Sequence, residues 1–121
     1  MEQKTFTLDE ARRALPLVKK IAADLQQAVN ALTKLPGGTS FLYGASPLDE
    51  LAPVNRPKAQ EFQEQIEALS AELLEIGVEV KGYQPVLVDF PAWRDEEMVC
   101  LCWAEGEADI AHWHTLTEGY R

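Results

Sequence analysis

Apolar residues recur at alternating three- and four-residue intervals along the first third of the chain. This spacing places one apolar stripe on a helix and is typical of a coiled-coil seam. Thr7 and Glu10 form the pattern of a capping box, so we expect a helix over about 7–35. Pro16 predicts either a kink near 12–16 or a short first turn before the long helix. The stripe consists of Leu8, Ala11, Leu15, Val18, Ala22, Leu25, Val29 and Leu32.

Helix breakers separate this pattern from a second one. Prolines and glycines recur between Pro36 and Pro57, so residues 36–56 are predicted to form a loop, either a functional lid or a plain connector. Pro57 at a first helical position and Gly77 as a stop then predict a helix over about 57–76. Its stripe consists of Ala59, Phe62, Ile66, Leu69, Leu73 and Ile76.

The two predicted helices carry opposite charges, which favours a long antiparallel helical hairpin of the coiled-coil type. Such a hairpin buries one stripe per helix, so it must pack on a sheet, on a second subunit, or on both. We expect a homodimer with a four-helix arrangement. The basic positions are Arg12, Arg13, Lys19 and Lys20, and the acidic ones are Glu61, Glu64, Glu67, Glu72 and Glu75.

The pattern changes to short β-favouring runs after Gly77. They lie at Val78–Val80, Pro85–Phe90, Met98–Trp103 and Asp109–His114, and predict a small antiparallel β-meander over 78–114. The fold class is therefore α+β, with a long antiparallel helical hairpin followed by a small antiparallel β-sheet in a single domain, 1–121.

The last two runs are joined by about five residues, 104–108, which suits a hairpin. Matching the apolar faces of these two runs fixes their expected register. Cys100 and His112 then become near neighbours, and a slip of one residue would separate cysteines from histidines. The matched sets are Met98, Cys100 and Cys102 on one strand and Ile110, His112 and His114 on the other.

Composition describes a folded protein with acidic character. The chain has 121 residues, of which 46% are hydrophobic and 26% charged, and its formal net charge is -9. The acidic excess lies after residue 35, so binding to nucleic acid or to anionic membranes is not expected. No signal peptide or membrane-spanning run is seen, and Cys100 and Cys102 are too close in sequence to pair. We expect a cytoplasmic protein with reduced thiols.

The cysteines and histidines allow several kinds of chemistry. Both Cys-x-Cys and His-x-His pairs on one sheet face could hold zinc, although this is not the spacing of structural zinc sites. His114 with Glu107, Asp89 or Cys102 would form a mixed site with an open position for water. Cys100 or Cys102 beside a histidine would allow nucleophilic catalysis. The plain alternative is that the cysteines belong to the core and the histidines bond to backbone carbonyls.

Several motifs follow one another along the chain: Phe6–Ala11 with Leu15–Val18, Gly77–Lys81, Leu87–Pro91, Leu101–Trp103 with Gly106–Glu107, and Trp113–His114. In this order they resemble the bacterial domain-of-unknown-function family DUF2203. The resemblance implies a helical hairpin and a short sheet, and it brings no established activity. Its polar motif members here would be Glu79, Lys81, Asp89, Cys102, Glu107 and His114, whereas Gly82 and Thr115 stand where acidic residues are common.

The sequence thus leaves two functions open. The first is a non-enzymatic oligomeric interaction or binding module whose small-molecule ligand, if any, the sequence does not identify. The second is a divalent-metal-binding protein or metal-dependent enzyme centred on Asp89, Glu107 and His114. The candidate metal ligands are His114, Glu107, Asp89 and Cys102, with zinc as the expected ion, and further polar candidates are Glu79, Lys81 and His112.

Overall fold

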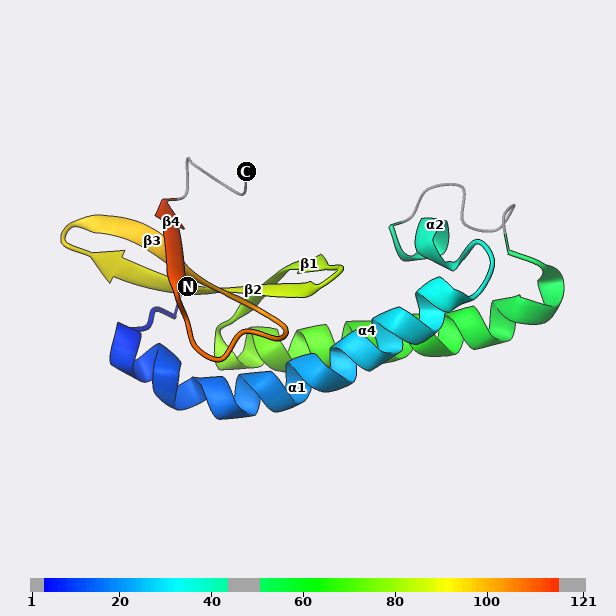
Figure 1. Ribbon diagram of the computed structural model, residues 1–121, viewed down its shortest axis with the longest axis horizontal. Helices are drawn as coiled ribbons and strands as arrows, with labels where there is room; N and C mark the ends of the chain where they lie inside the picture. Colours follow the sequence, from blue (N-terminus) through cyan, green and yellow to red (C-terminus); the bar gives the residue numbers. More distant parts are fainter. Residues whose placement is uncertain (1–3, 44–50, 116–121) are drawn as a thin grey trace.

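The computed structural model describes residues 4–43 and 51–115. Two long helices lie beneath a four-stranded antiparallel sheet (Figure 1), so the α+β class is confirmed. The helices are α1 (Leu8–Lys34), α2 (Gly38–Leu42) and α4 (Arg56–Ile76), with the short 3-10 turn η1 (Pro53–Asn55) before α4. The strands, in sheet order, are β1 (Glu79–Tyr83), β2 (Val86–Arg94), β3 (Glu97–Ala104) and β4 (His112–Thr115).

Helix α1 begins at the predicted capping box. The Thr7 hydroxyl accepts a hydrogen bond from the Glu10 amide at 3.1 Å, and the Glu10 carboxylate accepts one from the Thr7 amide at 2.9 Å. The helix then continues through Pro16 without interruption, so the alternative of a short separate first turn is wrong. Its dark-blue first turns are inclined to the remainder in Figure 1, as a kink at a proline requires.

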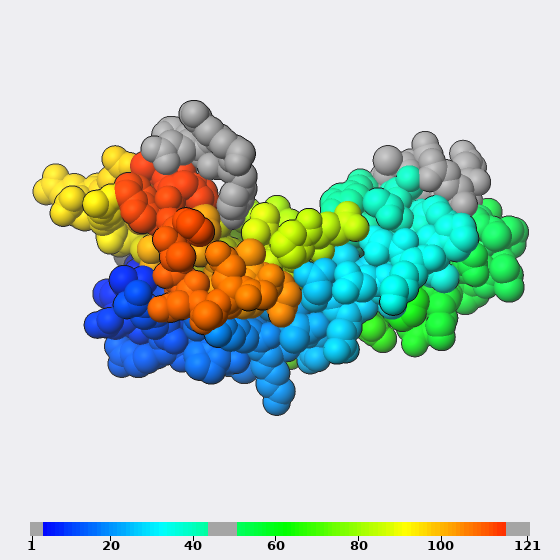
Figure 2. Space-filling model, viewed as in Figure 1, coloured from blue at the N-terminus to red at the C-terminus, as the bar shows by residue number. Residues whose placement is uncertain are grey.

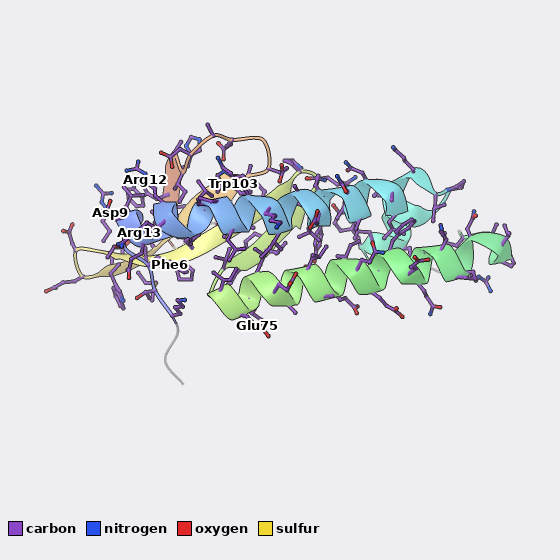
Figure 3. All side chains as sticks on the ribbon, turned by 90° about the horizontal axis from the view of Figure 1, so that it is seen from below. Phe6, Asp9, Arg12, Arg13, Glu75 and Trp103 are labelled. Atoms are coloured by element: carbon purple, nitrogen blue, oxygen red, sulfur yellow. The ribbon has the colours of Figure 1, made fainter. Side chains whose placement is uncertain are left out.

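Helices α1 and α4 lie side by side along most of their length (Figures 1 and 3). The predicted α1 stripe is buried except for Leu8, which is exposed at the N-terminal end. On α4 every second stripe position is fully buried and the positions between them are half-buried. The buried residues of the two stripes are Ala11, Leu15, Val18, Ala22, Leu25, Val29 and Leu32 on α1 and Ala59, Ile66 and Leu73 on α4.

The segment predicted as a loop over 36–56 contains regular structure that the sequence did not reveal. Helix α2 folds back against the end of α1, and η1 leads into α4, while residues 44–50 lie outside the described part. A Cβ added at Gly38 would lie only 1.8 Å from the Leu32 carbonyl oxygen, so the close approach of α2 to α1 requires glycine.

One face of the sheet covers the helices and completes the core. Side chains of alternate residues on β2 and β3 point into it, and Phe6 packs edge-to-face on Phe90 with ring centroids 5.3 Å apart. The Phe6 amide also donates a hydrogen bond to the Pro91 carbonyl at 2.8 Å. Strand β2 continues through Pro91 to Arg94, whereas the predicted strand ended at Phe90. The inward residues are Val86, Val88 and Phe90 on β2 and Trp103 on β3.

The connection between β3 and β4 is longer than predicted. It spans residues 105–111 instead of 104–108, and lies against α1 in the space-filling view (Figure 2). Arg12 pairs with Asp109 at 3.3 Å and Lys19 donates to the Ala108 carbonyl at 2.6 Å, while Ile110 is buried. These contacts keep residues 109–111 on the helix, so β4 starts only at His112.

Candidate metal centre

Three polar side chains meet on the outer face of the sheet, away from the helices. Asp89 lies between Val88 and Phe90, which point into the core, and Cys102 similarly precedes buried Trp103. Because successive side chains of a strand point to opposite faces, Asp89 and Cys102 point outward. The two residues are direct cross-strand partners, and β4 adds His114 beside them.

The distances among these side chains are short. The Cys102 thiol donates to Asp89 Oδ1 at 3.3 Å, and His114 Nε2 lies 3.4 Å from Asp89 Oδ2. One potential ligand atom from each of the three residues lies within 4.8 Å of those of the other two. One oxygen, one sulfur and one nitrogen donor therefore converge from β2, β3 and β4.

The centre of this cluster is buried. The Asp89 side chain is 1% exposed and that of His114 is 13% exposed, whereas Cys102 is half-buried. Asp89 is also the one polar or charged residue among the fully buried side chains of the described part. A carboxylate in such surroundings requires compensating positive charge or hydrogen-bond donors.

The ring of His114 is oriented by its neighbour in sequence. Its Nδ1 lies 2.8 Å from the Thr115 carbonyl oxygen, an atom that can only accept a hydrogen bond. Nδ1 therefore carries a proton, and Nε2 points toward the Asp89 carboxylate. Either a second ring proton or a metal ion can hold Nε2 and Asp89 Oδ2 at their separation of 3.4 Å.

The whole chain was compared with known proteins. The sequence model of the uncharacterised conserved protein family DUF2203 matches residues 4–121. The chain belongs to this family. No curated protein and no solved structure matched it. Within the described residues of this DUF2203 member, no helix has both the length and the apolar character needed to cross a membrane.

Three of the four metal ligands expected from the sequence converge in the DUF2203 chain, and Glu107 lies outside them. Its Oε1 accepts from the Ala104 amide at 2.7 Å, and its backbone carbonyl accepts from the Trp103 indole at 2.9 Å. Its other oxygen, Oε2, lies 3.8 Å from His112 Nε2. Glu107 therefore stabilises the turn after β3 and faces His112.

For β3 and β4 of this DUF2203 chain, the sequence predicted correctly which residues share a sheet face, but it predicted the wrong cross-strand pairs. Both cysteines and both histidines share one face, as predicted. However, Cys100 lies opposite His114, and Cys102 lies opposite His112, which is a shift of two residues from the predicted pairing. The longer connection causes this shift, because it delays the start of β4.

Cys100 belongs to the buried part of the outer face. It is 6% exposed, and burial, followed by the nearby charges of Asp89 and Glu79, raises the pKa of its thiol to about 11. A thiol with this pKa is a poor nucleophile at neutral pH. The hydrogen bond of Cys102 goes to Asp89, which differs from the cysteine-to-histidine contact that nucleophilic catalysis requires.

Glu79 and Lys81 form the border of the cluster on β1. Glu79 lies opposite Asp89, and its carboxylate pairs with Lys81 at 2.8 Å. The hydrogen bond to Glu79 is the main cause that raises the pKa of Lys81, with smaller contributions from Asp89 and Cys100. Both side chains are over a third exposed, so this pair contributes little stability and supplies a charged rim.

Two features of this region have no signal in the sequence. The Thr115 carbonyl, which orients the His114 ring, is a backbone group, and no residue type would have revealed it. Arg94 lies 4.1 Å over the ring of Trp113, a contact that joins the end of β2 to β4 on the opposite face of the sheet.

Proposed function

We propose that the protein binds one divalent transition-metal ion through Asp89, Cys102 and His114. The observation that carries this proposal is the convergence of one oxygen, one sulfur and one nitrogen donor from three adjacent strands, whose ligand atoms all lie within 4.8 Å of one another. A metal ion would bind all three donors and replace the proton of the Cys102 thiol. Of the two functions that the sequence leaves open, this arrangement of donors favours metal binding.

The donor set favours zinc. A thiolate with an imidazole suits zinc or a similar borderline ion, whereas magnesium and calcium prefer sets made of oxygen alone. The Nδ1 of His114 donates to a carbonyl, which is the arrangement that metal-binding histidines use to fix the ring and present the other nitrogen. The three ligands come from three adjacent strands, so the ion would hold β4 against β2 and β3.

The metal content of the purified protein tests this proposal. Protein expressed with zinc and then dialysed should retain about one equivalent of zinc, since all three donors come from a preformed sheet. Cys102→Ser and His114→Ala should each lose most of the bound zinc. Cys100→Ala is the matched control, because it removes the other thiol of the same face and keeps the three assigned donors, and it should retain the zinc.

Two results would contradict the proposal. One is wild-type protein that folds and holds no stoichiometric divalent metal after exposure to zinc, iron, cobalt and nickel in turn. The other is equal loss of zinc in Cys100→Ala and Cys102→Ser, with both variants folded by circular dichroism. In that case the donors would not be the ones assigned.

A second function, self-association, is supported by the outer surface of the helices. A groove of about 620 Å³ runs between α1 and α4, and its lining is largely apolar. Helix α1 carries more Lys and Arg than Asp and Glu, and α4 carries the reverse. A two-fold dimer that sets α1 of one copy against α4 of the other would fill the groove and pair these charges. The groove residues are Asp24, Gln27, Ala28, Ala31, Phe62, Gln65, Ala68 and Leu69.

If α1 and α4 of each copy pack as the antiparallel coiled-coil hairpin expected from the sequence, two copies joined in this way would form a four-helix bundle. The two functions are compatible, because the groove lies between the helices and the metal ligands lie on the far face of the sheet.

A further inference from the structure

His112 shares the outer sheet face with the three donors and is the nearest further donor on β4. It lies directly opposite Cys102, and in antiparallel sheets directly opposed residues have Cβ atoms about 4.5–5.5 Å apart. Asp89, Cys102 and His112 therefore occupy one row across β2, β3 and β4. The His112 side chain is 72% exposed, so no packing in the described part fixes its ring away from that row.

Glu107 supplies the second observation. One of its oxygens is held by the Ala104 amide at 2.7 Å, and the other lies 3.8 Å from His112 Nε2. Metal-binding histidines usually have a carboxylate or carbonyl at the ring nitrogen that does not bind the metal. His114 has such a partner in the Thr115 carbonyl, and His112 has one in Glu107.

From this arrangement we propose that His112 is the fourth protein ligand of the metal and binds it through Nδ1, with Glu107 behind its Nε2. The inference rests on the metal site proposed above and deepens it. Glu107, which the sequence suggested as a ligand, acts instead as the positioning residue for His112. The proposal requires the exposed His112 ring to turn Nδ1 toward Cys102 while Nε2 stays beside Glu107.

A fourth protein ligand decides what kind of site this is. Four protein donors give a closed tetrahedral site, whereas three leave a position for water or substrate. With His112 bound, β4 would contribute two ligands, and the ion would fix this four-residue strand at the sheet edge. The site is therefore structural and stabilises the fold, and the metal has no open position for catalysis.

Zinc affinity and cobalt spectra of His112 variants test the inference. Competition with a chromophoric chelator should show that His112→Ala binds zinc at least about 10-fold more weakly than the wild type, and Glu107→Gln should weaken binding by about 10-fold. His112→Cys, which offers another donor, should restore most of the affinity. His112 is exposed, so its variants should fold normally, and glutamine keeps the oxygen that accepts from the Ala104 amide in Glu107→Gln; circular dichroism checks all of them.

The response of the cobalt spectrum to added imidazole distinguishes a metal ligand at position 112 from a residue that only supports the fold. In the cobalt-loaded His112→Ala variant, added imidazole should enter the vacated position and shift the visible absorption spectrum. The cobalt-loaded wild type should not respond, since its four positions are filled by the protein.

The inference is overturned if His112→Ala binds zinc within about twofold of the wild type, or if imidazole shifts the wild-type spectrum as much as that of the variant. Both results would leave the three-donor site intact and open. Failure of the proposed metal site would look different, because the wild type itself would then bind neither zinc nor cobalt.

Discussion

At the scale of single residues, the orientation of one histidine ring determines what the outer sheet face can bind. The Thr115 carbonyl accepts a hydrogen bond from Nδ1 of His114, so Nε2 faces the buried carboxylate of Asp89. The His114 and Asp89 side chains are 13% and 1% exposed, so this contact lies away from bulk water and is stabilised by a cation, either the second proton of the ring or a metal ion.

Glu105 shows the same cost of burying a carboxylate, at a position outside the metal centre. Its Oε2 is buried without a hydrogen-bond partner among the described residues. Burial raises the pKa of this carboxyl, and attraction to Lys19 lowers it by a smaller amount. As pH rises, the unfolded chain therefore loses this proton before the folded one, and the stability of the fold decreases through that interval and stays reduced at neutral pH.

Glu105→Gln should therefore raise the thermal midpoint at pH 7 by a few degrees, because the amide carries no charge to desolvate. The gain should shrink as pH falls below the ordinary pKa of a glutamate, where the wild-type carboxyl is already protonated. Thermal melts of both proteins between about pH 4 and pH 8, across the pH interval in which Glu105 loses its proton, provide the measurement. The control is Glu96→Gln in the exposed turn between β2 and β3, which should show no such trend. A lower midpoint for Glu105→Gln at pH 7 would contradict this account.

At the scale of elements, the helices were predictable because their ends carry local signals. The capping box at Thr7 marks the start of α1, and the left-handed Gly77 marks the end of α4. Both signals are local in sequence, so the predicted boundaries of the two helices are within one residue of the observed ones. Helix α2 has only five residues and thus no period to detect. The start of β4 was not predictable either, since contacts of the β3–β4 connection with α1 determine it.

These effects explain why the sequence indicated the site residues but not their arrangement. The two-residue period of a strand placed Cys100, Cys102, His112 and His114 on one face, independent of register. Which cysteine lies opposite which histidine depends on the length of the β3–β4 connection, and hence on contacts between residues distant in sequence. Glu107 was suggested because it is an acid near the histidines, yet its distance to the cluster is set by the turn that it stabilises.

The outer groove of α1 and α4 gives a prediction at this scale. Ala68 is an exposed small residue in the groove, so Ala68→Arg should block docking of a second copy without disturbing the monomer. Leu74→Arg is the matched control. Leu74 is 64% exposed and lies two and a half turns along α4 from Gln65, hence on the side opposite the groove.

Sedimentation at about 10–100 μM, where weak dimers are populated, should give a dimer for the wild type and Leu74→Arg, and a monomer for Ala68→Arg. High salt should weaken the dimer, because opposite charges on α1 and α4 contribute to it. A wild-type monomer at these concentrations would remove the self-association proposal, and a dimer of Ala68→Arg would place the interface elsewhere.

At the scale of the whole molecule, the β3–β4 connection joins the metal centre to the helices. It contains Glu107, contacts α1 through Arg12 and Lys19, and leads into β4 at His112. An ion bound by β2, β3 and β4 would therefore also hold this connection on α1. The proposed metal binding at the outer face would in this way be linked to the stability of the packing between sheet and helices.

The central claim is that Asp89, Cys102 and His114 hold one metal ion, and a cobalt titration tests it most directly. Cobalt bound to a thiolate produces a sulfur-to-metal charge-transfer band in the near ultraviolet. We predict that this band grows to saturation at about one equivalent of cobalt, as expected for a single preformed site, and that added zinc abolishes it. It should persist in Cys100→Ala and disappear in Cys102→Ser. Absence of the band in the folded wild type, or its persistence in Cys102→Ser, would contradict the claim.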